Sequence, residues 1–227
     1  MTLEIGLLAL ESILLIATII LLIYSIKEGK QRDKLILEVG KATKILTRQE
    51  YFLNVLDSMM DAKEDIRGCI TGRMPSGEDN KMTRDIVATI ERRVKDGINF
   101  TYLLPKFPDR LHIGYLYTKA GAQVLYSSCL MVHNIRFITV DDKIVVMGIP
   151  ESTGEKQATR KGYRIPSEGL AMVLNNYFET CEKQITFKDY VNEVMTQTGA
   201  STKHLASEYQ IDEAELKKLT GTSGSSF

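Results

Sequence analysis

The chain has 227 residues, 44% of them hydrophobic and 26% charged, which is enough for one folded domain of ordinary size with appendages. Its 29 Lys and Arg residues balance its 29 Asp and Glu residues, so net charge gives no argument for binding to nucleic acid or to an acidic surface. The three cysteines are scattered and odd in number, which indicates packed thiols in a reducing compartment more than a disulfide framework. No cluster of His and Cys suggests a metal site, and we expect neither a metal nor a cofactor.

An apolar run near the N-terminus predicts a membrane anchor within residues 1–26. Ile5–Ile26 reads "IGLLALESILLIATIILLIYSI" and contains a single charge, Glu11. At ~1.5 Å per residue the run reaches ~33 Å, which matches a hydrocarbon core of ~30 Å. A cleaved signal peptide is disfavoured because no basic segment precedes the run. Glu11 would either extend toward the outer face or pair with another membrane helix.

The flanks of this run predict its orientation. Nothing positive precedes it, whereas four basic residues follow it closely: Lys27, Lys30, Arg32 and Lys34. The positive-inside rule therefore places the N-terminus outside the cell membrane and the rest of the chain in the cytoplasm. The lipid bilayer is the first expected partner.

The remainder of the chain reads as a helical stalk over residues 27–50, a domain over 51–185, and a small helical element over 186–220. Within the domain, expected elements are a helix at 51–66, a strand at 66–72, a helix at 83–97, a strand at 98–105, a helix at 107–121, strands at 122–128, 134–140 and 143–149, and a helix at 166–185. The alternation of helices and strands predicts an α/β fold, a mixed sheet flanked by helices. A tight hairpin is expected at Asp141-Asp142.

The C-terminal element has a helix–turn–helix rhythm but no basic face. Its acidic residues offset its lysines, so binding to nucleic acid is disfavoured and a packing or docking role is preferred. Residues 221–227, "GTSGSSF", predict a flexible tail.

The two hairpin strands carry a motif that resembles the phospholipase D superfamily over roughly Tyr51 to Lys183. Members carry His-x-Lys, four residues, Asp, six residues, and Gly-Ser-x-Asn. In this sequence Asn134 takes the histidine position and Arg136 the lysine position, Asp141 matches the aspartate, and Gly148–Glu151 replaces Gly-Ser-x-Asn. The spacing is kept while most of the polar identities are not. The resemblance implies the family fold, and a homodimer, since single-motif members pair two subunits to build one site.

The change at the histidine position bears on the chemistry. In the family that histidine attacks phosphorus, and the amide of Asn134 can neither attack nor carry a proton near neutral pH. We expect His133 to face the other side of the strand from Asn134 and Arg136. This reasoning argues against an enzyme.

Anion binding could remain at the motif. Arg136 offers a planar guanidinium suited to phosphate, and we predict Asn134, Arg136, Asp141 and Glu151 as ligand-binding residues. A following loop with Arg160, Lys161 and Arg164 could close over them, or could be solvated surface. Alternatively, Arg136 pairs with a carboxylate such as Glu151 or Glu168.

Three functions follow from these observations. The first is a membrane-tethered, non-catalytic module that acts as a scaffold, binds a protein partner at the membrane or in the cytoplasm, or senses a phosphorylated ligand. The second is a divergent phosphodiesterase or nuclease that uses His133. The third is a membrane-bound, DNA-associated regulator that uses the C-terminal helices, and we rank it last.

Overall fold

The computed structural model describes residues 13–30, 44–77, 79–129, 132, 133, 135–150 and 159–221, without the side chains at 44, 45, 149, 150 and 159–161. The chain divides into two compact units, Met1–Ala42 and Thr43–Phe227, which are treated separately below.

The first unit contains one described helix, over residues 13–30. Its apolar side chains are exposed, from Ile13 at 64% to Tyr24 at 71%. Across the parts of the chain that the structure describes, no helix is both long and apolar enough to cross a membrane. The anchor predicted at Ile5–Ile26 begins before the described part, and Glu11 lies outside it.

The second unit is built on a mixed sheet of eight strands in the order β1-β7-β6-β5-β2-β3-β4-β8. The strands are β1 (Lys44–Thr47), β2 (Asp65–Cys69), β3 (Asn99–Pro105), β4 (Gln123–Ser127), β5 (Arg136–Val140), β6 (Ile144–Pro150), β7 (Thr159–Pro166) and β8 (Ile185–Thr186). The three strands β2, β3 and β4 run parallel, and every other pairing is antiparallel. The predicted α/β class with a mixed sheet is confirmed.

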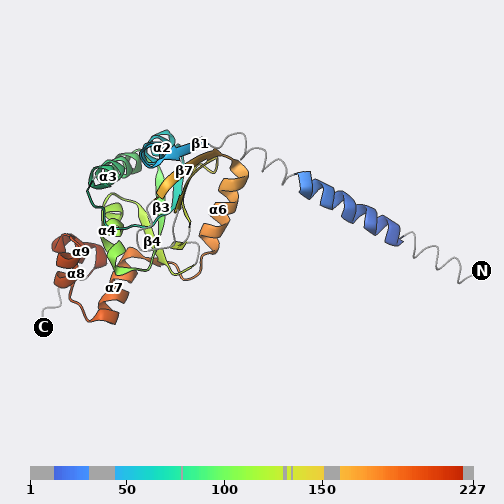
Figure 1. Cartoon of the computed structure of the whole chain (residues 1–227). Helices are drawn as coiled ribbons and strands as arrows, with labels where there is room; N and C mark the ends of the chain where they lie inside the picture. The colour runs from blue at the N-terminus through green and yellow to red at the C-terminus, as the bar shows by residue number, and fades with distance from the viewer. Residues whose placement is uncertain are drawn as a thin grey trace, which may run out of the picture. The chain divides into compact units, whose positions relative to one another are not determined.

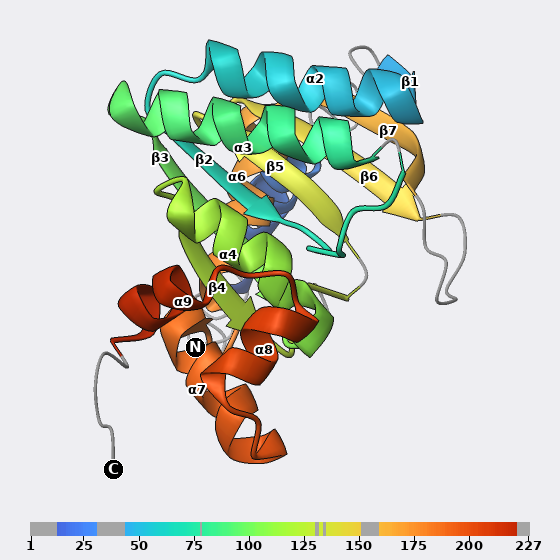
Figure 2. The ribbon, with the colours of Figure 1, turned by 90° about the vertical axis from the view of Figure 1, so that its left-hand side faces the viewer.

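Helices cover both faces of this sheet (Figure 1 and Figure 2). They are α2 (Arg48–Asp61), α3 (Asp79–Lys95), the 3-10 turn η1 (Pro108–Arg110), α4 (Leu111–Lys119), α6 (Glu168–Thr180), α7 (Phe187–Thr198), α8 (Thr202–Glu208) and α9 (Glu213–Thr220). Helices α2, α3 and α4 lie on one face, and α6 packs against β5 and β6 from the other. Central strands are therefore covered on both sides, which explains why the last four residues of β5 are all buried instead of alternating with exposed ones.

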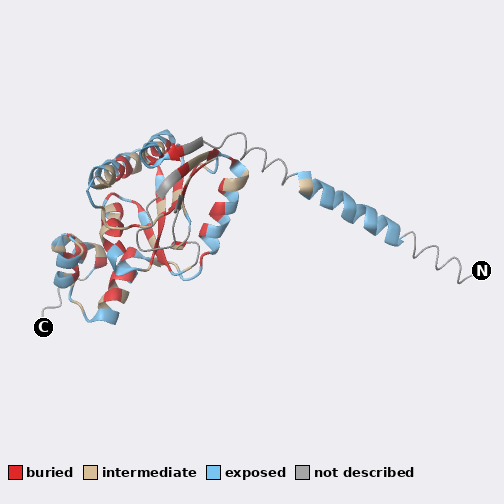
Figure 3. Ribbon diagram, viewed as in Figure 1, coloured by how far each residue is buried: buried red, intermediate tan, exposed pale blue. Residues whose placement is uncertain are grey.

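Buried side chains concentrate between the sheet and the helices that cover it (Figure 3). One cluster joins α2, α3 and α4 to the strands and continues into the C-terminal helices through Phe187, Leu205 and Leu216. The element predicted at 186–220 thus packs onto the domain. Glu215 also accepts a hydrogen bond from the Tyr115 hydroxyl on α4 and pairs with Lys119 at 2.8 Å.

The hairpin predicted at Asp141-Asp142 is confirmed. Both residues have positive φ, 50° and 55°, and the Lys143 N–H donates to the Val140 carbonyl oxygen across them. Val140 lies opposite Ile144, so Lys143 belongs to the connection as well. The Asp142 carboxylate accepts a hydrogen bond from the Asn175 amide of α6, and the Asn175 carbonyl oxygen accepts one from the Thr139 hydroxyl at 2.7 Å. The hairpin is thereby linked to the helix that covers it.

Three strands differ from the sequence expectation. The stalk predicted over 27–50 gives way to β1 at Lys44, and α2 begins at Arg48, where Thr47 and Glu50 form a capping box. The loop predicted at Arg160, Lys161 and Arg164 is instead strand β7, which pairs with β6 and β1. The short β8 ends the sheet beside β4. Each of these strands is held by pairing with a distant part of the chain, which local sequence patterns do not reveal.

The expectation of packed thiols is wrong for two of the three cysteines. Cys129 follows β4 and Cys181 follows α6, and a disulfide joins them with their Cα atoms 6.0 Å apart. The fold brings the ends of these two elements together, and that distance is normal for a disulfide. Cys69 remains a free, buried thiol, and burial raises its pKa to about 12.

Candidate functional site

Strands β5, β6 and β7 place Arg136, Gly148 and Gly162 in one row. In the register of the sheet Arg136 lies opposite Gly148, and Gly148 lies opposite Gly162. Directly opposite residues present their side chains on the same face. The ring of Tyr51 from α2 occupies the space that a side chain at Gly162 would fill. The motif's lysine position, Arg136, and its first glycine position, Gly148, are thus paired across neighbouring strands.

Arg136 lines a cavity of about 210 Å³ between the sheet and the helices α2, α3 and α4. The walls come from the N-terminal half of each of α2 and α3, from the loop after β2, and from β3, α4 and β5. In chain order the lining residues include Arg48, Tyr51, Phe52, Thr71, Arg73, Met82, Ile86, Tyr102, Ile113, Tyr117, Arg136 and Ile138. The loop after β2 and the start of β5 lie at the carboxyl ends of the parallel strands, where α/β sheets commonly bind ligands.

Three arginines from different elements line this cavity: Arg48 at the start of α2, Arg73 in the loop after β2, and Arg136 at the start of β5. Burial lowers the pKa of Arg136, and the guanidinium groups of its neighbours Arg73, Arg110 and Arg48 act in the same direction. Positive charge is therefore concentrated at one end of the cavity. Asp79 at the start of α3 offsets part of it by pairing with Arg48 at 2.6 Å.

A fourth arginine, Arg110, lies behind the loop that carries Arg73. It is only 6% exposed, and its guanidinium sits 5.6 Å from the centroid of the Phe107 ring and pairs with Asp109. Among the described residues no hydrogen-bond acceptor reaches its buried Nε. Burial lowers the pKa of Arg110, and Arg73 lowers it as well, so these groups are electrostatic neighbours.

Three tyrosines line the same cavity. Tyr51 comes from α2, Tyr102 from β3 and Tyr117 from α4, and the rings of Tyr102 and Tyr117 lie 4.9 Å apart. Burial raises the pKa of Tyr51 to about 12, against a smaller opposing effect of Arg136, and burial also raises the pKa of Tyr102 and Tyr117 above the ordinary range. All three are neutral near pH 7 and can donate hydrogen bonds to an anion.

The structure does not bring all predicted site residues together. Asn134 and Glu151 lie outside the described residues. Asp141 lies at the other end of β5 from Arg136, on the order of 16 Å away along the strand. Its carboxylate accepts backbone N–H groups of Lys63 and Glu64, each at 2.9 Å, and of Asp65 at 3.1 Å. Asp141 therefore ties the start of β2 to the hairpin.

His133 does not lie on the strand. β5 begins at Arg136, and His133 belongs to a short helical turn before it, so the argument from strand alternation is wrong. The half-buried imidazole contacts the edge of Phe107, with the ring centroids 5.2 Å apart. Because the Arg110 guanidinium lies over the same Phe107 ring, His133 is separated from the arginine cluster by one aromatic side chain.

Sequence reasoning missed Arg48, Tyr51, Arg73 and Arg110. Each looks ordinary locally: Arg48 lies in the predicted stalk, Tyr51 opens an amphipathic helix, Arg73 lies in a polar loop, and Arg110 lies in the helix predicted at 107–121. Gly162 in "TRKGYRIP" was a weak signal. A glycine inside a β-strand often marks a place where another part of the chain approaches the backbone closely. Nothing in the pattern, however, links these positions to Arg136.

The described lining residues of the cavity include arginines, tyrosines, threonines and Asp79, and no histidine or cysteine is among them. Within the described ranges, no group of three or more His, Cys, Asp or Glu residues could hold a metal ion.

No protein-family model matches the chain, and no curated protein matches its sequence. Among solved structures, NucT from Helicobacter pylori superposes with a TM-score of 0.50 at 15% identity, over 63% of this chain and 98% of that one. Nuc from Salmonella typhimurium, a phospholipase D family member, has a TM-score of 0.47 at 14% identity, over 64% of this chain and 97% of that one. The archaeal chromatin protein TrmBL2 has a TM-score of 0.44 at 13% identity, over 71% of this chain and 64% of that one.

At these identities the likeness concerns the fold alone. The chain shares with NucT from Helicobacter pylori a fold over 63% of its length.

Proposed function

We propose that this chain is a membrane-tethered, non-catalytic phospholipase D-like module that binds a phosphate-bearing anion in the Arg136 cavity. One observation carries the proposal: Arg48, Arg73 and Arg136 line a single cavity although they lie far apart in the sequence, with Arg110 close behind them. Guanidinium groups bind phosphate oxygens through charged, directional hydrogen bonds. Burial first and the neighbouring guanidinium groups second lower the pKa of Arg136, and a bound anion would oppose both effects.

The non-catalytic part of the proposal rests on the motif and on the cavity wall. Asn134 stands at the position of the family's attacking histidine. Tyrosines 51, 102 and 117 have raised pKa values, so they are poor nucleophiles near neutral pH. A module of this kind would act through what it holds, as a sensor of a phosphorylated ligand or as a scaffold for a protein partner.

The tether is proposed from the apolar run at Ile5–Ile26 and from the exposed apolar side chains of the helix over 13–30. The basic residues after it favour a domain on the cytoplasmic side. Sedimentation of membranes tests this part of the proposal: the full chain should pellet with membranes and a variant without residues 1–43 should not. A full chain that stays in the supernatant would contradict it.

The binding site is tested by titrating inorganic phosphate into the purified full chain by calorimetry. Arg136→Gln removes one guanidinium and keeps an amide of similar reach, and we expect the affinity to fall at least about tenfold, since a charged hydrogen bond contributes about 1.5–3 kcal/mol. Arg84→Gln is the matched control, because Arg84 lies exposed on α3 and does not line the cavity. Equal loss in both variants would indicate general charge, and unchanged binding in Arg136→Gln would refute the site.

A divergent phosphodiesterase is the second candidate, because His133 lies one aromatic ring away from Arg110. In single-motif relatives two subunits pair, so a homodimer would be needed to bring two such imidazoles together. Hydrolysis of bis(4-nitrophenyl) phosphate by the wild type, abolished in His133→Ala, would establish this activity and replace the non-catalytic proposal. Sedimentation equilibrium of the same samples measures whether the chain pairs.

A further inference from the structure

The Arg136 cavity is larger than an inorganic anion needs. One ordered water requires ~10–15 Å³ of such space, and the cavity offers about 210 Å³. Its charged lining residues are Arg48, Arg73, Arg136 and Asp79. The remaining wall is formed by apolar side chains from five elements: Phe52 and Val55 of α2, Met82 and Ile86 of α3, Ile113 of α4, Ile70 after β2, and Ile138 of β5.

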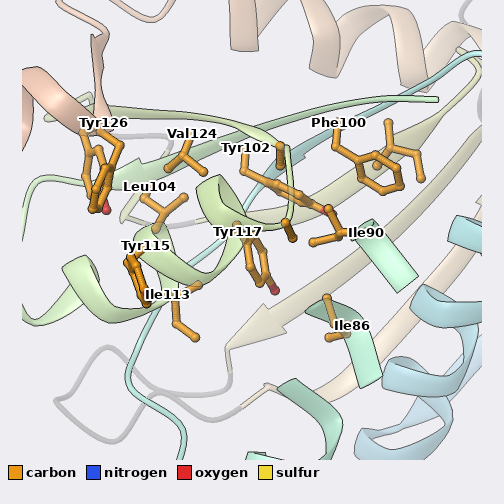
Figure 4. Packing of buried hydrophobic residues seen from close by; sticks show 14 of the residues in the cluster. Ile86, Ile90, Phe100, Tyr102, Leu104, Ile113, Tyr115, Tyr117, Val124 and Tyr126 are labelled. Atoms are coloured by element: carbon orange, nitrogen blue, oxygen red, sulfur yellow. The ribbon is translucent and has the colours of Figure 1, made fainter. Parts of the chain in front are cut away.

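The apolar wall belongs to the rigid core of the domain. Ile86, Ile113 and Ile138 are 7%, 4% and 3% exposed, and Figure 4 shows Ile86 and Ile113 in the packed cluster that also contains Tyr102 and Tyr117. Side chains packed in this way hold fixed positions, so this part of the wall stays apolar. The apolar part of the cavity is therefore a preformed space, and water inside it has few hydrogen-bond partners.

Tyrosines line the cavity beside both kinds of group: Tyr51 comes from α2, Tyr102 from β3 and Tyr117 from α4. Tyr51 interacts electrostatically with Arg136, and the rings of Tyr102 and Tyr117 lie 4.9 Å apart. The wall of the cavity thus combines guanidinium, phenol and aliphatic side chains. A ligand that matched this wall would carry both an anionic group and an apolar group.

We propose that the ligand of this cavity is a small organic anion, a phosphate monoester with an apolar substituent about the size of one ring. This inference rests on the proposed function and specifies its ligand class. The ester phosphate lies against Arg136 and Arg73, and its substituent lies against Ile86, Ile113 and Ile138. Inorganic phosphate has no surface to bury there, so the substituent adds affinity by removing apolar area from water.

Calorimetry of the full chain with three probes tests this ligand class: inorganic phosphate, phenyl phosphate, and phenol as a neutral ring. We expect phenyl phosphate to bind at least about tenfold more tightly than inorganic phosphate, which corresponds to about 1.4 kcal/mol. Phenol should bind more weakly than phenyl phosphate, since it lacks the charge that the arginines recognise.

A filled cavity supplies the second measurement. Met82 lies at the cavity wall and is partly exposed, so Met82→Trp can occupy the apolar space without replacing a core residue. It should lower the preference for phenyl phosphate over inorganic phosphate about tenfold. Met172→Trp is the matched control, because Met172 is 60% exposed on α6 and lies outside the cavity. Thermal unfolding of both variants verifies that they are folded.

The outcomes separate this inference from the proposed function. If inorganic phosphate and phenyl phosphate bind equally well, or if Met82→Trp weakens both alike, the substituent is not recognised; the inference fails and the anion site stands. If neither phosphate binds, or if phenol binds as tightly as phenyl phosphate, the anion site itself fails and the inference fails with it. Tighter phenyl phosphate binding that Met82→Trp alone removes supports both.

Discussion

The ring of Tyr51 lies directly on the backbone of Gly162, so that a Cβ atom at residue 162 would come within 2.8 Å of Tyr51 Cβ. This contact sets the position of α2 over β7 and of the Tyr51 hydroxyl beside Arg136. No residue other than glycine leaves room for the ring, so the contact is a requirement of the cavity as well as of the core.

Gly162→Ala should therefore destabilise the domain and weaken anion binding. The added methyl group forces Tyr51 and α2 to shift, and overpacking of this kind costs about 1–3 kcal/mol. Urea unfolding measures the free energy, and calorimetry with phosphate measures the binding. Tyr51→Phe is the companion variant, because it keeps the ring on Gly162. Its free energy of unfolding should stay within about 1 kcal/mol of wild type. Equal stability of wild type and Gly162→Ala would contradict the packing.

Asp141→Ala should unfold more easily without loss of anion affinity. The variant removes the acceptor of three backbone N–H groups at the start of β2 and places alanine at a φ of 50°. We expect a loss of about 1–3 kcal/mol in the free energy of unfolding. Asp141→Asn, which tolerates this φ and retains one acceptor, should lose less. Asp57→Ala, exposed on α2, is the control with almost no change. A marked fall in phosphate affinity in Asp141→Ala would show instead that this carboxylate serves the site.

The Cys129–Cys181 disulfide should add to stability. It closes a sequence separation of 52 residues, and restriction of the unfolded chain by such a loop corresponds to about 4 kcal/mol. Reduction by a dithiol, or Cys129→Ser, should lower the urea midpoint accordingly. Cys69→Ala should respond to reduction as wild type does, since Cys69 lies outside the disulfide. No change in midpoint on reduction would contradict the bond.

The same disulfide makes the proposed orientation measurable. The cytoplasm keeps thiols reduced, whereas extracytoplasmic compartments allow disulfides to persist. A domain on the cytoplasmic side should have Cys129 and Cys181 available to a thiol-alkylating reagent when cells are lysed in its presence. Protection of both thiols until a reductant is added would place the domain on the other side of the membrane and reverse the orientation read from Lys27 and Lys30.

Stability should fall steeply at alkaline pH. Burial raises the pKa of Cys69 from 9.0 to about 12 and that of Tyr51 from 10.0 to about 12. Because the folded pKa lies above the unfolded one, the contribution to stability is complete below pH 9 and is lost as the pH rises toward 12. Urea midpoints measured from pH 7 to 11 should decline above pH 9. The urea midpoint of Cys69→Ala should decline less between pH 9 and 10 than that of wild type. The same decline of the midpoint in both proteins would contradict the raised pKa of Cys69.

Several features of the fold could be read locally. The hairpin at Asp141-Asp142 followed from two short apolar runs joined by two turn-forming residues, and both aspartates have the positive φ that this turn requires. Helix α2 followed from its amphipathic spacing, although its start at Arg48 did not. Strand β7 was not predicted, because its residues Arg160 to Arg164 are mostly polar and acquire their conformation from pairing with β6 and β1.

The sequence by itself determined the hairpin that carries Arg136, the motif spacing that places Gly148 opposite it, and the class of fold, because each depends on neighbours only a few residues apart. The tertiary structure alone decided that Arg48, Arg73 and Arg110 approach Arg136 and that Cys129 meets Cys181. These groups come from separate elements, and only the sheet order and the crossing helices bring them together. Because these residues are far apart in the sequence, no local sequence pattern predicts their contacts. The cavity and its positive charge could therefore be identified only in the folded structure.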